Sequence, residues 1–189
     1  MNRRDAIERV ALLVGGTVIG AEFFISGCKA PTSKQVNALF NANQVAFLNE
    51  VGNTILPDTK TPGAKAADVG SFMAIMVLDC YTPADQKTFM QVFTKIDEES
   101  LNKFSKKFLD ADAKQRTELL TYLDREQKKE SKATKPGNKY HYFSMVKQMT
   151  LLGYFTSEIG CTKALRYIEV PGSFNGNLPY KKGDRAWAT

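Results

Sequence analysis

Side chains that could perform acid–base, nucleophilic or metal chemistry are scarce in this sequence of 189 residues. It holds one histidine, His141, and three cysteines, Cys28, Cys80 and Cys161. These numbers exclude a histidine-rich zinc site, a four-cysteine iron–sulfur cluster and, because no C-x-x-C-H is present, a c-type haem. A Ser–His–Asp enzyme would have only His141 as its base.

The catalytic motifs that a sequence can reveal are missing as well. No G-x-G-x-x-G, P-loop, C-x-x-C or H-E-x-x-H occurs. His141 stands between two tyrosines, which is more typical of a packing or surface histidine than of a base. Asp79, Asp85 and Asp97 could supply paired carboxylates, but Asp85 fits a helix start and Asp97 a solvated turn. We therefore predict no catalytic, cofactor-binding or metal-binding residues in this chain, and a binding or accessory role.

Two of the cysteines could act structurally. In an oxidising compartment Cys80 and Cys161 can pair, and a bridge closing a loop of this size would stabilise the fold by roughly 4–5 kcal/mol. The alternatives are two buried free thiols, or one thiol bridging to a partner subunit.

The first 27 residues are predicted to be an export signal and are set apart from the fold. Arg3 and Arg4 are followed by a glycine-rich apolar stretch over residues 10–21. This stretch is too short to span the bilayer as a helix, which needs about 20 residues. The segment resembles a bacterial twin-arginine signal, although Ala6 and Glu8 depart from the residues usual there. That route carries folded cargo, often with a bound partner.

Residues 25–28, Ile-Ser-Gly-Cys, resemble a lipobox. Cys28 is therefore predicted to carry a lipid, to become the N-terminus and to anchor an exported protein of the bacterial periplasm or cell envelope to a membrane. Residues 28–42 would form a tether, and residues 43–189 a single domain. The alternative is an N-terminal amphipathic helix with an incidental cysteine. Three arginines and three acids leave with the signal, so the mature chain keeps the whole net charge of +6.

Apolar residues at helical spacing predict an all-α, small multi-helix domain. Asn43 is expected to cap the first helix and Pro57 to stop it, and Thr82 with Pro83 begins the third. The expected helices cover residues 43–56, 69–79, 82–104, 112–126 (or from 110), 140–155 and 156–165.

Two segments are expected to be irregular. Gln127–Lys139 carries five lysines with a Pro-Gly pair, which predicts a solvated loop. No aromatic residues are interleaved with these charges, so we predict no nucleic-acid partner. The end of the chain is rich in glycine, proline and aromatic residues, which predicts an irregular, aromatic-rich C-terminal tail carrying Phe174, Tyr180 and Trp187.

Several short segments, in order along the chain, together resemble the gluconate 2-dehydrogenase subunit 3 family. They are Ile55–Ala64, Asp79–Pro83, Leu151–Gly160, Leu165–Tyr167, Val170–Gly172 and Gly183–Trp187. Leu-Gly-Tyr-Phe-Thr-Ser-Glu, within Leu151–Gly160, is the most distinctive. Family members typically carry a twin-arginine signal, which agrees with Arg3 and Arg4.

The resemblance implies a partner and not a reaction. The large subunit of such complexes is a flavin-dependent dehydrogenase of the glucose–methanol–choline type, which holds FAD and oxidises a sugar or sugar acid. A cytochrome c subunit with haem c usually passes the electrons on. The small subunit would bind the folded flavoprotein, lend it an export signal and stabilise it. A lipid on Cys28 departs from this picture, because it would make the small subunit itself a membrane tether.

The aromatic residues have two possible places. Tyr154 and Phe155, on a helix, are expected in the domain's own core. In the tail, Phe174, Tyr180 and Trp187 are candidate contacts with the partner, because aromatic side chains are favoured anchors at interfaces.

Two other functions stay open. One is a free-standing envelope lipoprotein that binds a ligand or scaffolds a complex. The weaker one is a small hydrolase using Asp79 or His141.

Overall fold

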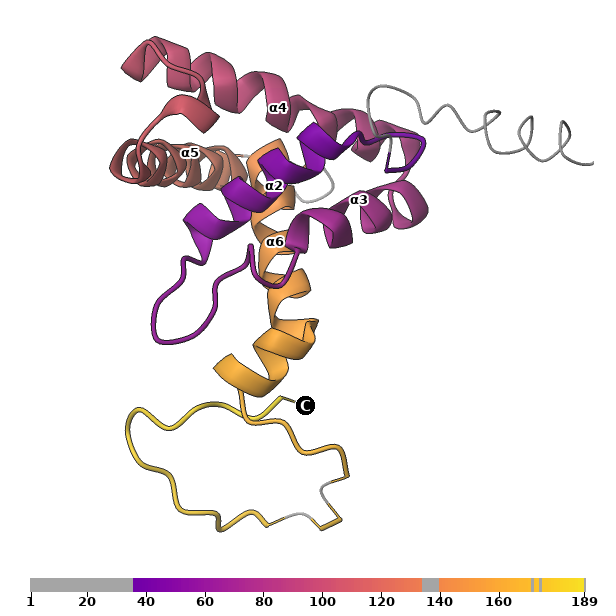
Figure 1. Ribbon diagram of the computed structural model, residues 1–189, viewed down its shortest axis with the longest axis vertical. Helices are drawn as coiled ribbons and strands as arrows, with labels where there is room; N and C mark the ends of the chain where they lie inside the picture. Colours follow the sequence, from indigo (N-terminus) through magenta and orange to yellow (C-terminus); the bar gives the residue numbers. More distant parts are fainter. Residues whose placement is uncertain (1–35, 134–139, 171, 174, 189) are drawn as a thin grey trace, which may run out of the picture. The chain divides into compact units, whose positions relative to one another are not determined.

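The computed structural model describes residues 36–133, 140–170, 172–173 and 175–188 of the chain (Figure 1). The predicted export signal, the lipobox and most of the tether lie outside them. Over the described residues the secondary structure is helical, with no strand, which confirms the all-α fold. The elements are α2 (Ala42–Ile55), α3 (Val69–Cys80), α4 (Pro83–Phe104), η1 (Phe108–Asp110), α5 (Ala113–Ala133), α6 (Tyr142–Thr156) and the π-helical turn η2 (Gly160–Ala164).

Helix α6 is the centre of the core, since it contacts α2, α3, α4 and α5. It buries apolar side chains on several sides, among them Phe143, Val146 and Tyr154. A helix that is apolar on more than one face must be surrounded by other elements, and the orange α6 in Figure 1 lies among the other helices accordingly. None of the described helices is long and apolar enough to cross a membrane.

The start of α2 differs slightly from the prediction, because its N-cap is Asn41 and not Asn43. The Asn41 side chain accepts a hydrogen bond from Gln44 N at 2.9 Å, and the Gln44 side chain accepts one from Asn41 N at 3.0 Å. This reciprocal pair is a capping box, and it satisfies two backbone donors that a lone cap would leave open. The helix ends at Ile55, just before Pro57, as predicted.

Packing begins earlier than the predicted domain start at residue 43. Phe40 is fully buried in the core, edge-on to Phe89. The Asn37 amide donates to Ala74 O at 2.8 Å and so joins this segment to α3. Residues 36–42, assigned to a tether from the sequence, are therefore part of the folded domain.

The solvated loop expected over Gln127–Lys139 is wrong for its first half, because α5 continues to Ala133. Residues 134–139 lie outside the described residues. Lysine, glutamate and glutamine are good helix formers, so a charged stretch need not end a helix. Asp124 supports this part of α5 through ion pairs with Lys128 (2.7 Å) and with Lys147 of α6 (2.5 Å).

Two smaller predictions also change. Asp97 does not lie in a solvated turn but within α4, where its carboxylate accepts a hydrogen bond from Phe108 N at 3.0 Å. This contact fixes the entry into η1. The short helix expected over residues 156–165 is present over residues 158–164, after Ser157, and differs from the expectation in its winding, which is π-helical from Gly160 on.

Candidate functional site

His141, the only histidine of the chain, serves as the N-cap of α6. Its Nδ1 accepts a hydrogen bond from Phe143 N at 3.2 Å, and its ring packs against Tyr142. Burial lowers the pKa of His141, and the carboxylate of Glu130, 3.8 Å from Nε2, opposes that shift. With Nδ1 occupied as the cap of α6, the His141 ring has a structural role.

The carboxylates considered for catalysis are not brought together. Asp79 is exposed near the end of α3, and Asp85 accepts a hydrogen bond from the Thr82 hydroxyl at 2.7 Å at the start of α4. Within the part of the chain that the structure describes, no three His, Cys, Asp or Glu residues are grouped so that they could hold a metal ion.

The two cysteines of the folded domain are free thiols. Cys80 is exposed at the end of α3, whereas Cys161 is half-buried in η2 and donates to Phe155 O at 3.2 Å. The intramolecular bridge between them, one of the alternatives from the sequence, is not formed in this structure.

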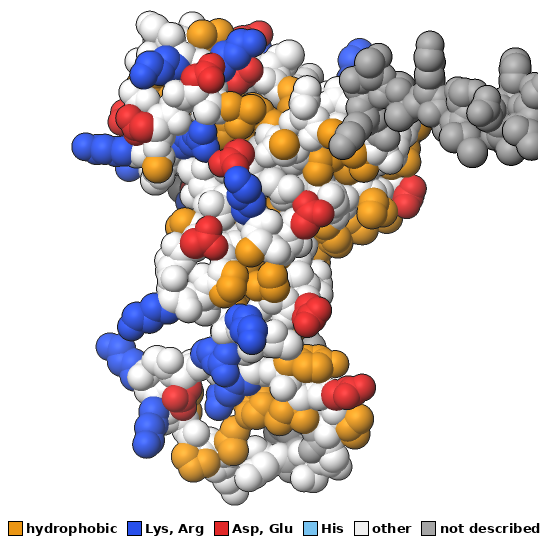
Figure 2. All heavy atoms as spheres, in the orientation of Figure 1, with side chains coloured by type: hydrophobic (Ala, Val, Ile, Leu, Met, Phe, Trp, Pro, Cys, Tyr) orange, Lys and Arg blue, Asp and Glu red, His pale blue; other side chains and the backbone are white. Residues whose placement is uncertain are grey.

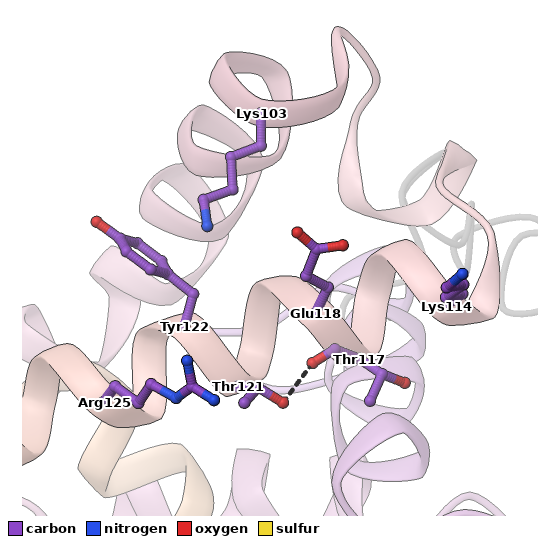
Figure 3. Close-up of a pocket in the computed structure, with 7 residues that line it drawn as sticks. All are labelled: Lys103, Lys114, Thr117, Glu118, Thr121, Tyr122 and Arg125. Atoms are coloured by element: carbon purple, nitrogen blue, oxygen red, sulfur yellow. Dashed lines mark hydrogen bonds between the residues drawn. The ribbon is translucent and has the colours of Figure 1, made fainter.

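A groove of about 570 Å³ lies between the end of α4 and one face of α5 (Figure 3). Lys103 of α4 places its ammonium group 3.4 Å from the ring centre of Tyr122, a cation–π contact that joins the two helices. The hydroxyls of Thr117 and Thr121 donate to backbone carbonyls one turn earlier, at 2.8 and 2.7 Å. These two hydroxyls are therefore engaged by the backbone of their own helix, and the Tyr122 hydroxyl donates to the Glu126 carboxylate.

The Leu-Gly-Tyr-Phe-Thr-Ser-Glu segment shapes the last turn of α6. A Cβ on Gly153 would lie 2.6 Å from the Phe72 ring, so glycine here permits the close approach of α3. The Tyr154 hydroxyl donates to Pro62 O at 2.6 Å and ties α6 to the loop between α2 and α3. Tyr154 is buried, as predicted, but Phe155 is 39% exposed and packs edge-on against Tyr154 instead of filling the core.

The C-terminal tail returns to the end of η2 and is fastened there by a small set of contacts, which we call the clasp (Arg166, Arg185 and Trp187). The backbones of Arg166 and Trp187 form an isolated parallel bridge, with Arg166 N donating to Ala186 O at 2.8 Å. The Arg166 guanidinium stacks over the Trp187 ring at 4.4 Å. Arg185 donates to the carbonyls of Thr162 and Lys163 at the end of η2.

Between the two ends of the clasp, the chain forms a loop over residues 167–184, which we call the arm. Its described residues are all exposed and include no helix or strand. Figure 2 shows hydrophobic side chains over this end of the domain, with lysine and arginine side chains gathered along its left edge. The exposed apolar side chains of the arm are Tyr167, Ile168, Val170, Leu178 and Tyr180.

The structure places two of the three predicted partner contacts, and it places them differently. Tyr180 is 73% exposed on the arm, whereas Trp187 is 41% exposed with one face covered by Arg166 of the clasp. Phe174 lies outside the described residues.

Comparison with known protein families gives one match. The family model described as gluconate 2-dehydrogenase subunit 3 matches residues 42–172, from the first residue of α2 into the arm. The chain belongs to this family. All the segments that carry the resemblance fall inside the match, except Gly183–Trp187. No curated protein and no solved structure matches the chain.

Membership in the gluconate 2-dehydrogenase subunit 3 family implies that this chain is a subunit of a complex of the gluconate 2-dehydrogenase type, and that it associates there with other subunits. The family is one of accessory subunits, and the capping and pairing roles of His141, Asp85 and Asp97 are consistent with that.

Proposed function

We propose that this protein is the non-catalytic small subunit of a membrane-associated, flavin-dependent dehydrogenase of the glucose–methanol–choline type, which oxidises a sugar or sugar acid. FAD would be held by the large catalytic subunit, and haem c by a cytochrome subunit. The observation that carries the proposal is the family match over residues 42–172.

Ion pairs between elements support the proposal that this chain is a pre-folded subunit that stabilises its partner. Glu50 illustrates this, since it binds both Lys65 and Arg116 and so joins α2 to the following loop and to α5. A hydrogen bond from Lys65 lowers the pKa of Glu50, against the opposing effect of burial. Such a carboxylate is a structural ion-pair partner, not a poised acid or base.

Export is the second part of the proposed role. A twin-arginine signal on the small subunit would carry the folded large subunit across the membrane with it, and a lipid on Cys28 would then hold the complex at the cell envelope. Replacement of Arg3 and Arg4 by lysine should leave both subunits in the cytoplasm, and Cys28→Ala should release an exported complex from the membrane fraction. Undiminished export of the double-lysine variant would contradict the twin-arginine part.

Co-expression tests the central claim. The catalytic subunit encoded with this chain should co-purify with it, and flavin absorbance and dehydrogenase activity should follow the catalytic subunit and not this chain. The catalytic subunit expressed alone should be less stable and should not be exported. A stable monomer of this chain with dehydrogenase activity of its own would refute the proposal, and so would the lack of any association between the two chains.

A further inference from the structure

The arm, residues 167–184, exposes all of its described residues. A loop of this length without secondary structure is uncommon in a compact domain and is typical of binding loops or of linkers; because both ends of the arm are fastened to the same domain, it does not link two domains. Its apolar side chains are not used by the domain's core, since Val170 is 78% and Tyr180 73% exposed. Single exposed apolar residues are ordinary, but several on one loop mark an interaction surface.

The clasp fixes the two ends of the arm independently of any partner. Two backbone hydrogen bonds, Arg166 N to Ala186 O and Ala188 N to Arg166 O, close the loop at its base. The stacking of Arg166 on Trp187 covers this base. Because the ends are already held, a partner that binds the arm has less chain entropy to remove.

Charge indicates the chemistry of the surface that the arm would meet. The arm, the clasp and η2 carry Lys163, Arg166, Lys181, Lys182 and Arg185 against only Glu169 and Asp184. Among the described residues, none of these five cations has a carboxylate within salt-bridge distance. Asp184 instead accepts a hydrogen bond from Lys181 N at 2.9 Å and closes a turn. The complementary surface is therefore acidic around an apolar centre.

We propose that the arm is the docking element by which this subunit binds an acidic, apolar-centred patch on the catalytic subunit of its complex, an inference that rests on the proposed function. Tyr167, Ile168 and Tyr180 supply the apolar anchors, and Lys181 and Lys182 steer the approach. The clasp residues are positioning residues that hold the arm in shape.

The test measures the affinity of the full-length chain for the co-expressed and separately purified catalytic subunit. A triple variant, Tyr167→Ala, Ile168→Ala and Tyr180→Ala, should weaken binding about 1,000-fold, because each of the three lost anchors costs about tenfold. The matched control is Ile75→Ala with Tyr140→Ala, which removes exposed apolar side chains of α3 and of the segment before α6. It should change the affinity less than about twofold.

A charge variant, Lys181→Glu with Lys182→Glu, keeps the test decisive even if the triple variant aggregates. It should slow association about tenfold at low salt, with a smaller effect as salt rises. The thermal midpoint should stay unchanged in both arm variants, because the arm lies outside the core. Arg166→Ala should weaken binding about tenfold through loss of the pre-formed loop.

The outcomes separate the two proposals. If the wild-type chain does not bind the catalytic subunit, the proposed function fails. If it binds and the folded arm variants bind equally well, only the docking role of the arm is overturned. It is also overturned if the arm variants bind the catalytic subunit normally but lose self-association in size-exclusion chromatography, or binding to vesicles of anionic phospholipid.

Discussion

The crossing of α2 and α3 offers the sharpest test of how this domain is held together. A Cβ added to Gly70 in the first turn of α3 would collide with Val45 O of α2 and would lie 2.9 Å from Asn49 Cγ. A backbone carbonyl in a helix cannot rotate away, so the two helices must separate. Overpacking costs about 1–3 kcal/mol, and a collision with rigid backbone falls in the upper part of that range, at about 2–3 kcal/mol. The better helix propensity of alanine returns about 1 kcal/mol.

Gly70→Ala should therefore lower the free energy of unfolding by about 1–2 kcal/mol. In urea this is a shift of the midpoint of about 0.5–1 M, followed by circular dichroism at 222 nm. Ser71→Ala is the matched control, since it makes a similar change one residue later in the same helix and should stay within about 0.5 kcal/mol of wild type. A Gly70→Ala protein as stable as wild type would refute the close approach of the two helices.

Three further predictions concern polar groups that are buried or half-buried. The pKa of His141 is lowered on folding, so the neutral imidazole stabilises the fold fully above the pKa of the unfolded chain, and this stabilisation is lost as pH falls through the pKa of the folded protein. The melting temperature should therefore drop between pH 7.5 and 5. The drop should be smaller in His141→Asn, which keeps a capping side chain. Ser100 Oγ is buried without a hydrogen-bond partner, so Ser100→Ala should raise the free energy of unfolding by about 1 kcal/mol in urea titration, and a clear loss would contradict this reading. Burial would raise the pKa of Asp124, but hydrogen bonds from Lys128, Lys147 and Gln127 hold it at about 2. The wild-type protein should therefore lose stability from about pH 4 downward, and Asp124→Asn should not show this loss. If the stability of both proteins falls in parallel with pH, the role given to Asp124 is wrong.

Local signals explain the parts of the fold that the sequence predicts well. Thr82 followed by Pro83 begins α4 as expected, because both residues act through their nearest neighbours. Pro57 likewise ends α2 within two residues of its position. The one misplaced cap, Asn41, also had a local signal, since Gln44 stands three residues later as a capping box requires.

Contacts between residues far apart in the sequence explain the parts of the fold that the sequence does not predict. The first turn of α3 is satisfied by Asn49 of α2, whose side chain accepts a hydrogen bond from Gly70 N at 2.7 Å. No sequence pattern near Asp68 predicts this hydrogen bond. The high charge of residues 127–133 also led to a wrong prediction, because these residues continue α5 and do not form a solvated loop. The ion pair of Asp124 with Lys147 of the next helix supports this part of α5, and the sequence of the segment alone does not show it.

In the candidate site, too, features that depend on composition were predicted, whereas features that depend on contacts between distant residues were not. Composition alone indicated a tail rich in aromatic residues, and the exposure of Tyr180 agrees with a surface place. The clasp could not be predicted, because it pairs Arg166 with Trp187 across the whole arm. The sequence spacing of these two residues carries no sign of a parallel bridge.

The clasp has an evolutionary and practical consequence. Since Arg166 and Trp187 close the arm at its base, the segment between them is an interchangeable cassette on a fixed helical scaffold. The entropy of loop closure rises by only about 0.6 kcal/mol for each doubling of loop length. The cassette can therefore be lengthened, shortened or exchanged while α2 to α6 keep their packing, so that a graft at this point could redirect the scaffold to a different catalytic subunit.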